Sequence, residues 1–106
     1  MALYIFLGKR TREGDMTVKD GPQRAAASAE YTKELGLKVI DYYATLGPYD
    51  YVSIIEGPDD PSTYFKLVTF AAMDGNITWT TLPALRGQDF IQLVQELPGR
   101  AGTRSR

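Results

Sequence analysis

The middle of the chain holds two β-rich segments separated by a glycine and a proline, and this arrangement constrains the fold more than any other feature. Residues 37–46 and 49–56 are rich in β-branched and aromatic side chains, which favour strands. The intervening Gly47-Pro48 is a turn signal of hairpin length. We therefore expect the two segments to pair as antiparallel strands of one sheet.

The residues before the hairpin predict one strand and one helix. Residues 3–9 form an apolar segment in which both alternating sets of side chains are hydrophobic, as in a central strand covered on two sides. A helix is expected to begin at Asp20 or Gly21, with Pro22 in its first turn. It should end before Gly36. One face of this helix carries small side chains that would let it lie close against a sheet, namely Ala25, Ala26, Ala29 and Thr32.

The residues after the hairpin repeat the pattern of helix and strand. Asp60 followed by Pro61 predicts a helix start, and Gly75 predicts the helix end. Residues 76–82 have high β propensity and predict a fourth strand. A last helix at about residues 88–97 carries apolar side chains on one side, which are Phe90, Ile91, Val94 and Leu97.

The predicted order is strand, helix, strand, strand, helix, strand, followed by a terminal helix. That order defines the split βαβ arrangement of ferredoxin-like domains. The sequence thus predicts an α+β fold, βαββαβ, with a four-stranded antiparallel sheet, helices on one face and an extra C-terminal helix. A chain of 106 residues has room for one such domain, which we place at residues 1–99.

Composition excludes several classes of chemistry. The chain contains no cysteine and no histidine. It therefore lacks the residues for thiol nucleophiles, Ser-His-Asp triads, zinc fingers, iron–sulfur clusters and imidazole-ligated haem. Carboxylates such as Asp59, Asp60 and Asp74 lack the spacing of a calcium-binding loop, and the glycines are too dispersed to cradle a nucleotide. We expect no metal and no cofactor.

Charge is nearly balanced, with a formal net charge of −1. Arg100, Arg104 and Arg106 lie at the C-terminal end, and we interpret residues 100–106 as a flexible basic tail. Without these arginines the chain is mildly acidic, and it has no basic stripe of the kind that nucleic-acid binding needs. We expect no nucleic-acid partner.

The N-terminal apolar stretch is far shorter than the hydrophobic region of a signal peptide or a membrane span. No positively charged region precedes it. We therefore expect a cytoplasmic protein without a membrane partner.

The alternation of side chains along the strands predicts which residues face the helices. In the second strand of the hairpin, Val52 and Ile54 have the character of a helix-facing set. In the first strand the corresponding set is Leu3, Ile5 and Leu7.

The alternate residues of these two strands would then point to the open face of the sheet, and they include the aromatic Tyr4, Phe6 and Tyr51. A two-residue hairpin turn adds Tyr42 to them, whereas a three-residue turn adds Tyr43 instead. An aromatic patch of this size is rarely left to solvent in a monomer. We therefore expect two sheets to pack face to face in a homodimer or a higher closed oligomer, and such packing can enclose a small-molecule site.

Three blocks of the sequence carry a family resemblance. The most distinctive is Leu-Gly-Pro-Tyr-Asp-Tyr-Val at residues 46–52, preceded by Tyr42-Tyr43 and followed by residues 55–60. Together with residues 19–24 at the first helix and residues 75–85 at the last strand, this block resembles the GYD domain family, over about residues 3–97. The resemblance implies a bacterial or archaeal protein with a ferredoxin-like fold and a dimeric α/β-barrel type of assembly. It also implies a family without a settled activity.

Asp50 is the candidate catalytic residue. It lies at the start of an apolar strand, where loss of water would raise the pKa of its carboxyl and make it a general base. The structural alternative is a hairpin carboxylate that accepts hydrogen bonds from nearby backbone amides. With tyrosine hydroxyls or Arg24 to hold an oxyanion, Asp50 would support a cofactor-free oxygenase or isomerase.

Several further side chains are candidates for ligand binding. Arg24, one turn inside the first helix, would hold an anionic ligand or form a salt bridge to Asp20 or Glu56. The basic residues within 9–12 would gather a carboxylate or phosphate, or simply face water. The predicted ligand-binding residues are Tyr4, Phe6, Arg24, Tyr42, Tyr49, Tyr51 and Trp79.

The sequence therefore predicts a homo-oligomeric small-molecule-binding domain with an aromatic-lined site at the sheet face. Two alternatives stay open, a catalytic role through Asp50 and a role as an assembly or partner-binding module. The expected partners are a second copy of the chain and a small organic molecule.

Overall fold

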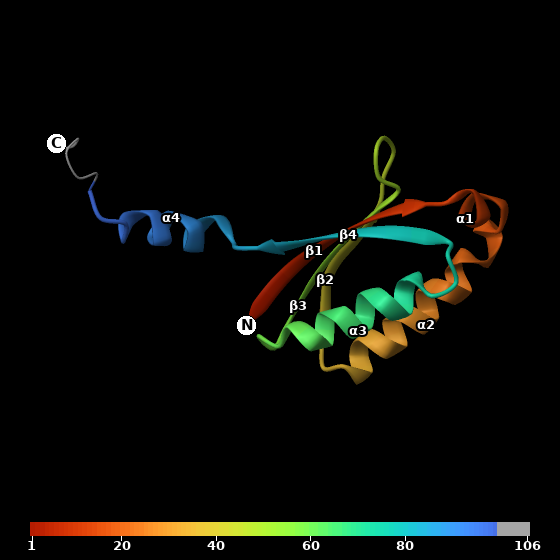
Figure 1. The fold of residues 1–106 in the computed structure, drawn as a ribbon, viewed down its shortest axis with the longest axis horizontal. Helices are drawn as coiled ribbons and strands as arrows, with labels where there is room; N and C mark the ends of the chain where they lie inside the picture. Colours follow the sequence, from red (N-terminus) through yellow and green to blue (C-terminus); the bar gives the residue numbers. More distant parts are fainter. Residues whose placement is uncertain (100–106) are drawn as a thin grey trace.

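The computed structural model describes residues 1–99 (Figure 1). The predicted basic tail at residues 100–106 lies outside this range. The elements, in chain order, are β1 Ala2–Arg10, α1 Arg12–Met16, the 3₁₀ helix η1 Val18–Asp20, α2 Gly21–Glu34, β2 Lys38–Ala44, β3 Tyr51–Gly57, α3 Pro61–Ala72, β4 Ile77–Ala84 and α4 Gly87–Gln95.

Four antiparallel strands form one sheet in the order β2-β3-β1-β4, and α2 and α3 lie on one side of it (Figure 1). The α+β, ferredoxin-like fold expected from the element order is confirmed. In the hairpin, Tyr42 is paired with Ser53 and Ala44 with Tyr51. This is the register expected from a two-residue turn, although the loop between the two strands spans residues 45–50.

The predicted cap residues flank both long helices, although the Asp20 side chain at the start of α2 makes no capping hydrogen bond. Pro61 is the first residue of α3, and the Asp60 carboxylate accepts a hydrogen bond from the Ser62 backbone N–H at 3.1 Å. Gly36 and Gly75 follow the ends of α2 and α3 with φ angles of 76° and 74°. Glycine adopts this left-handed conformation without steric cost, so the chain can leave each helix sharply.

The short helix α1 lies where the sequence shows only a polar stretch without apolar periodicity. The Thr11 hydroxyl caps it by accepting a hydrogen bond from the Gly14 N–H at 3.1 Å. Thr11 is also tied to the turn before β4, because its backbone N–H donates to the Asn76 carbonyl at 2.9 Å. Its hydroxyl donates to the Gly75 carbonyl at 2.7 Å. A contact between distant parts of the chain therefore stabilises this turn.

The hydrophobic core lies between the sheet and the two long helices. Phe6 and Ile55 enter it from the sheet, and Tyr64 and Leu67 enter it from α3. Each of these four side chains is at most 4% exposed. Leu37, just before β2, completes the buried cluster.

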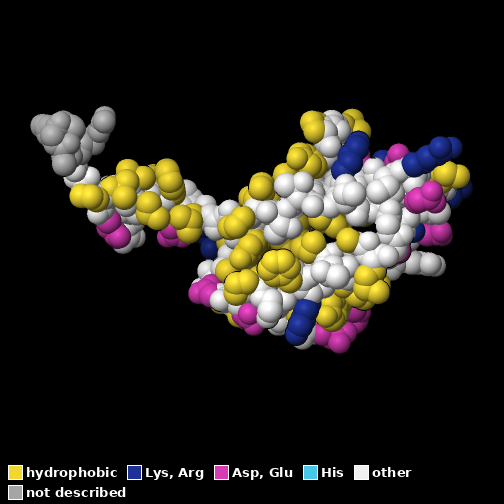
Figure 2. Space-filling view, in the orientation of Figure 1, with side chains coloured by type: hydrophobic (Ala, Val, Ile, Leu, Met, Phe, Trp, Pro, Cys, Tyr) yellow, Lys and Arg dark blue, Asp and Glu magenta, His cyan; other side chains and the backbone are white. Residues whose placement is uncertain are grey.

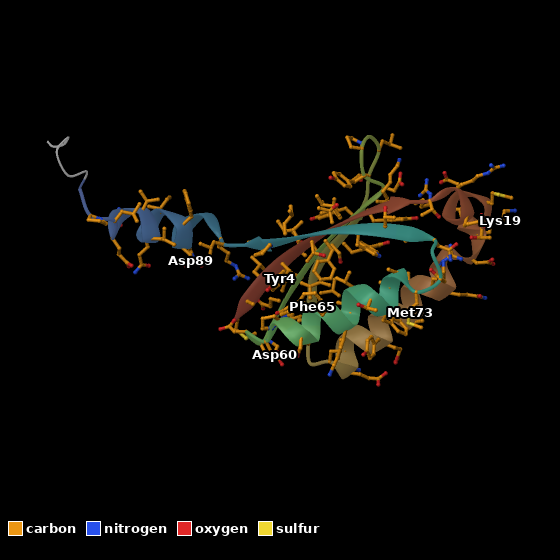
Figure 3. All side chains as sticks on the ribbon, in the orientation of Figure 1. Tyr4, Lys19, Asp60, Phe65, Met73 and Asp89 are labelled. Carbon is orange, nitrogen blue, oxygen red and sulfur yellow. The ribbon has the colours of Figure 1, made fainter. Side chains whose placement is uncertain are left out.

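The predicted orientation of the strand side chains is wrong. Tyr4, Phe6 and Tyr51 face the helices, and the ring of Tyr4 lies 4.0 Å from the ring of Tyr64 on α3, measured between centroids (Figure 3). The open face of the sheet instead carries the aliphatic side chains that were expected to be covered, namely Leu3, Ile5, Leu7, Val52 and Ile54.

The side chains of α2 explain this reversal. Both parities of β1 are apolar, so alternation alone does not decide which set is covered. The helix presents small side chains such as Ala25 and Ala29 toward the sheet. Large aromatic side chains on the sheet are then needed to reach across to the helices, whereas shorter aliphatic side chains serve on the other face.

The last helix, α4, leaves the end of β4 and projects away from the rest of the fold (Figure 1). Every residue of α4 is exposed, including Phe90 at 56% and Ile91 at 59%. Figure 2 shows its hydrophobic side chains gathered on the projecting helix. No helix within residues 1–99 has the length and apolar character that a membrane crossing requires.

Candidate functional site

A cavity of about 800 Å³ lies between the sheet and α2. Its opening is visible in Figure 2 as a dark slot between the sheet and the helices near α1. The sheet side of the cavity is formed by aromatic and aliphatic side chains, among them Phe6 and Ile55, together with the hydroxyl-bearing Ser53. The helix side is formed by the small residues of α2, including Ala25, Ala29 and Thr32.

The small residues of α2 leave this space open. The sequence predicted that they would let α2 lie close against the sheet, but Ala25, Ala26 and Ala29 stay exposed and line the cavity instead. Thr32 is the one buried residue of α2. A methyl side chain on α2 cannot fill the volume that a leucine would fill in a packed core, so a cavity remains.

Aromatic rings form one wall of the cavity. The rings of Tyr42 and Tyr51 are stacked, with centroids 6.0 Å apart and an angle of 12° between their planes. Phe6 and Trp79 meet edge to face at 6.4 Å. Partial loss of water and the neighbouring Tyr51 raise the pKa of the Tyr42 hydroxyl further above neutral pH. Like any tyrosine hydroxyl at neutral pH, it is protonated and can donate a hydrogen bond.

Trp79 is packed closely against β1. Its ring atoms lie 2.7–3.1 Å from the position that a Cβ atom would take on Gly8, so glycine is needed there to admit the indole. The indole N–H is buried and has no hydrogen-bond partner among residues 1–99. Trp79 was predicted as a ligand-binding residue, and the structure brings it to the cavity wall.

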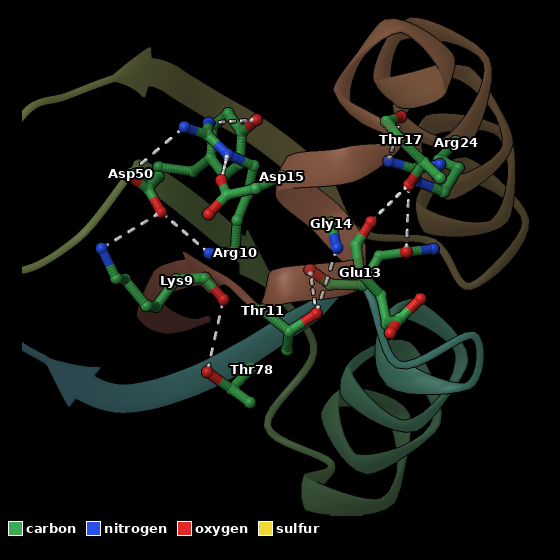
Figure 4. Close-up of polar contacts among 12 residues, drawn as sticks. Lys9, Arg10, Thr11, Glu13, Gly14, Asp15, Thr17, Arg24, Asp50 and Thr78 are labelled. Atoms are coloured by element: carbon green, nitrogen blue, oxygen red, sulfur yellow. Dashed lines mark hydrogen bonds and ion pairs between the residues drawn. The ribbon is translucent and has the colours of Figure 1, made fainter.

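Arg10, the last residue of β1, lines the cavity beside this aromatic wall, and Figure 4 shows its polar contacts. Its side chain donates to the Asp15 carboxylate at 2.7 Å and to the Tyr51 hydroxyl at 3.0 Å. Its guanidinium carbon lies 5.6 Å from the centre of the Tyr51 ring, within cation–π range. Both hydrogen bonds raise the pKa of Arg10, and the bond to Asp15 has the larger effect. Arg10 is therefore cationic at every working pH.

Arg24 enters the same end of the cavity from α2. Its side chain donates to the Thr17 carbonyl at 3.1 Å (Figure 4) and lies 3.9 Å from the Asp74 carboxylate. The expected salt bridge to Asp20 or Glu56 is not the one formed, because Glu56 pairs with Arg86 on the opposite face of the sheet.

Asp50 lies outside the cavity, at the end of the sheet. Its carboxylate accepts a hydrogen bond from the Arg10 backbone N–H at 2.8 Å and lies 3.7 Å from the Lys9 ammonium (Figure 4). The backbone hydrogen bond, above all, lowers the pKa of Asp50 below its usual range, and the nearby cations add to this effect. The predicted rise in pKa is wrong, and the carboxylate serves as a backbone acceptor across 40 residues of sequence.

Asp50→Asn should therefore destabilise the protein in a pH-dependent way. A carboxyl whose pKa is lowered by folding contributes stability above its unfolded-state pKa of about 3.9, and this contribution disappears as the pH falls through the folded-state value. We expect the variant to have a lower Tm than the natural protein at pH 7 and a smaller deficit below about pH 4. A deficit in Tm that stays constant from pH 7 to pH 3 would contradict this role.

Five of the seven predicted ligand-binding residues line the cavity, and two do not. Tyr4 packs on Tyr64, and Tyr49 belongs to the loop between β2 and β3. Arg10 and Ser53 also line the cavity. Arg10 had been considered only as one of the basic residues within 9–12 that would gather a carboxylate or phosphate or face water, and Ser53 had not been considered as a ligand-binding residue. The alternation of side chains along a strand identifies both residues, because side chains an even number of positions apart face the same side of the sheet. Arg10 lies an even number of positions from Phe6, and Ser53 lies an even number of positions from Tyr51. Within residues 1–99 no three carboxylates gather as a metal site.

Sequence comparison places the chain in a family. The profile of the GYD domain family matches residues 4–94. The chain belongs to the GYD domain family. A relative from Thermus thermophilus, named glutamine synthetase and cystathionine beta-lyase binding protein, is 32% identical to this GYD-domain chain over 92 residues. The match covers 86% of this chain and 96% of the relative.

Solved structures agree on the fold. The 5-chloro-2-hydroxyhydroquinone dehydrochlorinase of Burkholderia phenoliruptrix AC1100 aligns with a TM-score of 0.57 at 16% identity, covering 84% of this GYD-domain chain and 98% of that one. The crystal structure of FFRP-DM1 aligns with a TM-score of 0.54 at 15% identity, covering 80% and 100%. At these identities the likeness shows the shared ferredoxin-like architecture and carries no activity across.

Proposed function

We propose that this GYD-domain protein is a homo-oligomer that binds a small molecule in the cavity between its sheet and α2. The observation that carries this proposal is the cavity itself. Its volume of about 800 Å³ falls within the range of roughly 300–1,000 Å³ that is usual for small-molecule sites. Its walls are mostly apolar and aromatic, and a few polar groups converge at one end, which is the composition that such sites share.

Self-association is the second part of the proposal. The open face of the sheet presents a row of aliphatic side chains, and Tyr43 and Leu82 on the same face are 52% and 41% exposed. The apolar side of α4 is uncovered as well. Apolar patches of this extent are unusual on a monomer, and a second copy related by two-fold symmetry would cover both sheets at once.

Native mass spectrometry of the purified protein tests both parts in one spectrum. We expect a dimer or a larger closed ring that carries small-molecule mass or takes up added 2-naphthamide, a neutral aromatic probe. Ala29→Phe, which places a ring in the cavity from α2, should abolish this uptake while the oligomer persists. Ala72→Phe is the matched control, because Ala72 is an exposed helical alanine outside the cavity.

Two outcomes would contradict the proposal separately. A monomer at micromolar concentration would contradict self-association through the open face. An oligomer of bare mass that takes up neither 2-naphthamide nor 2-naphthoate would contradict small-molecule binding, as would equal uptake by Ala29→Phe and the natural protein.

A partner-binding module is the second candidate function, and one comparison favours it. The Thermus relative is named as a binding protein for two enzymes. In this chain α4 offers an exposed amphipathic helix, the kind of element that docks in a groove of another protein. A second protein bound in stoichiometric amount would appear as added mass in the same spectra. Loss of this added mass in Phe90→Asp, but not in Ala29→Phe, would favour the partner-binding function. Asp50 lies outside the cavity, so the geometry gives no support to a reaction that uses it as the base.

A further inference from the structure

The polar groups of the cavity are unevenly placed. The guanidinium groups of Arg10 and Arg24 lie at the end near α1, together with Asn76. Away from that end the lining carries no charged group and is mostly apolar, with Phe6 and Ile55 on the sheet and the small residues of α2 opposite, together with the hydroxyls of Ser53 and Thr32. A ligand that fills the cavity must therefore be amphipathic, with its polar group toward α1 and an apolar body between the sheet and α2.

Among the charged side chains that line the cavity, positive charge is in excess. Two arginines line the cavity, and Asp74 is the one carboxylate that residues 1–99 contribute to its wall. Asp74 lies 3.9 Å from Arg24 and is 48% exposed, so it neutralises that arginine weakly. Asp15 and Asp50 approach Arg10 from outside the cavity. These two carboxylates offset the charge of Arg10 and, together with the Tyr51 hydroxyl, engage its three guanidinium nitrogens. Arg24, whose carboxylate contact within residues 1–99 is the weak pair with Asp74, is therefore the main partner left for an anionic ligand group.

The shape of the apolar part favours a flat ligand. The stacked pair of Tyr42 and Tyr51 and the edge-to-face pair of Phe6 and Trp79 present ring surfaces along one wall. The facing wall is formed mainly by small side chains of α2, with Leu67 and Phe70 of α3 beside them. A planar ring placed between these walls would pack on the aromatic side chains, and rings pack in offset or edge-on geometry with added stabilisation.

We propose that the cavity takes a planar aromatic monocarboxylate, with the carboxylate at the Arg10 and Arg24 end and the ring between the aromatic wall and α2. This inference rests on the proposed small-molecule function and adds the chemical class of the ligand. Arginine suits the role because its fork of N–H donors pairs with a carboxylate in two parallel hydrogen bonds. The hydroxyl of Tyr42 supplies a further donor at the cavity wall.

The test compares two probes of nearly identical shape. 2-Naphthoate carries the carboxylate, and 2-naphthamide replaces it with a neutral amide. We expect isothermal titration calorimetry on the full-length protein to give an affinity for 2-naphthoate at least about tenfold higher than for 2-naphthamide. The indole N–H resonance of Trp79 should shift with both probes, and it is assigned without ambiguity because the chain has one tryptophan.

Substitution of one arginine tests where in the cavity the carboxylate of 2-naphthoate binds. Arg24→Gln should lower the affinity for 2-naphthoate by about tenfold and leave that for 2-naphthamide within about twofold. Arg86→Gln is the matched control, because Arg86 pairs with Glu56 outside the cavity, and it should change neither affinity. Equal affinities for the two probes would overturn the ligand class and leave the proposed function standing. Absence of binding by both probes, with the Trp79 resonance unmoved, would overturn both proposals.

Discussion

Ile55→Ala should lower the free energy of unfolding by about 2–5 kcal/mol, the cost of truncating a large aliphatic side chain in a packed core. Ile55 is 3% exposed and belongs to the buried cluster between the sheet and the helices. Removing three methyl or methylene groups there takes away contacts with the rest of the buried cluster and enlarges the neighbouring cavity, which Ile55 also lines. Urea unfolding followed by circular dichroism at a fixed protein concentration measures the change.

The neighbouring Ile54→Ala is the matched control, because it removes the same atoms from the opposite face of the sheet. We expect it to lose less stability at low protein concentration and to weaken self-association instead. The deficit of Ile54→Ala should therefore grow with protein concentration, as it does when a mutation acts on an oligomer interface. If Ile54→Ala costs as much as Ile55→Ala in a monomeric sample, the assignment of the two faces is wrong.

Gly14→Ala should destabilise the protein by about 1–3 kcal/mol, because α1 has no space for a side chain at this position. A Cβ atom on Gly14 would collide with the backbone carbonyl oxygen of Asn76. Neither side can yield easily, since the Thr11 N–H donates to that same carbonyl at 2.9 Å and fixes the distance between α1 and the start of β4. A lower midpoint in urea with an unchanged m value is the expected result.

Gly21→Ala is the control for this second prediction. Gly21 is the first residue of α2, has an ordinary helical φ of −53°, and has open space around its Cα. Alanine at this position should be neutral or slightly stabilising, since it restricts the unfolded chain without strain in the folded one. A loss of stability equal to that of Gly14→Ala would show that the collision with Asn76 is not the cause.

The two long helices and the sheet could be predicted from local signals. Asp60 with Pro61 marks a helix start by cap chemistry, and Gly36 and Gly75 mark helix ends by their left-handed conformation. The order of the elements then restricts the topology to a split βαβ arrangement, because connections are short and hairpins join antiparallel strands. These signals act within a few residues of one another, which is why they can be recognised in a single sequence.

The cavity could be predicted only in part. The sequence identified most of the aromatic residues and Arg24, but it assigned the aromatic residues to the open face. In a strand whose two parities are both apolar, the covered side depends on the size of the side chains that face it from the helices. That partner surface lies many positions away along the chain, so the pattern within β1 carries no information about it.

The sequence by itself determined the four strands, the helices α2, α3 and α4, the order of these elements, the absence of thiol and imidazole chemistry, and the family. The tertiary structure decided which face of the sheet carries the aromatic rings, that Arg10 and Arg24 line the same cavity, and that Asp50 is an acceptor for a distant backbone N–H. The physical reason is the separation along the chain of the residues that interact. Helix caps, turns and β propensity arise between neighbouring residues, whereas a cavity, a charge pair and a pKa arise between side chains that only folding brings together.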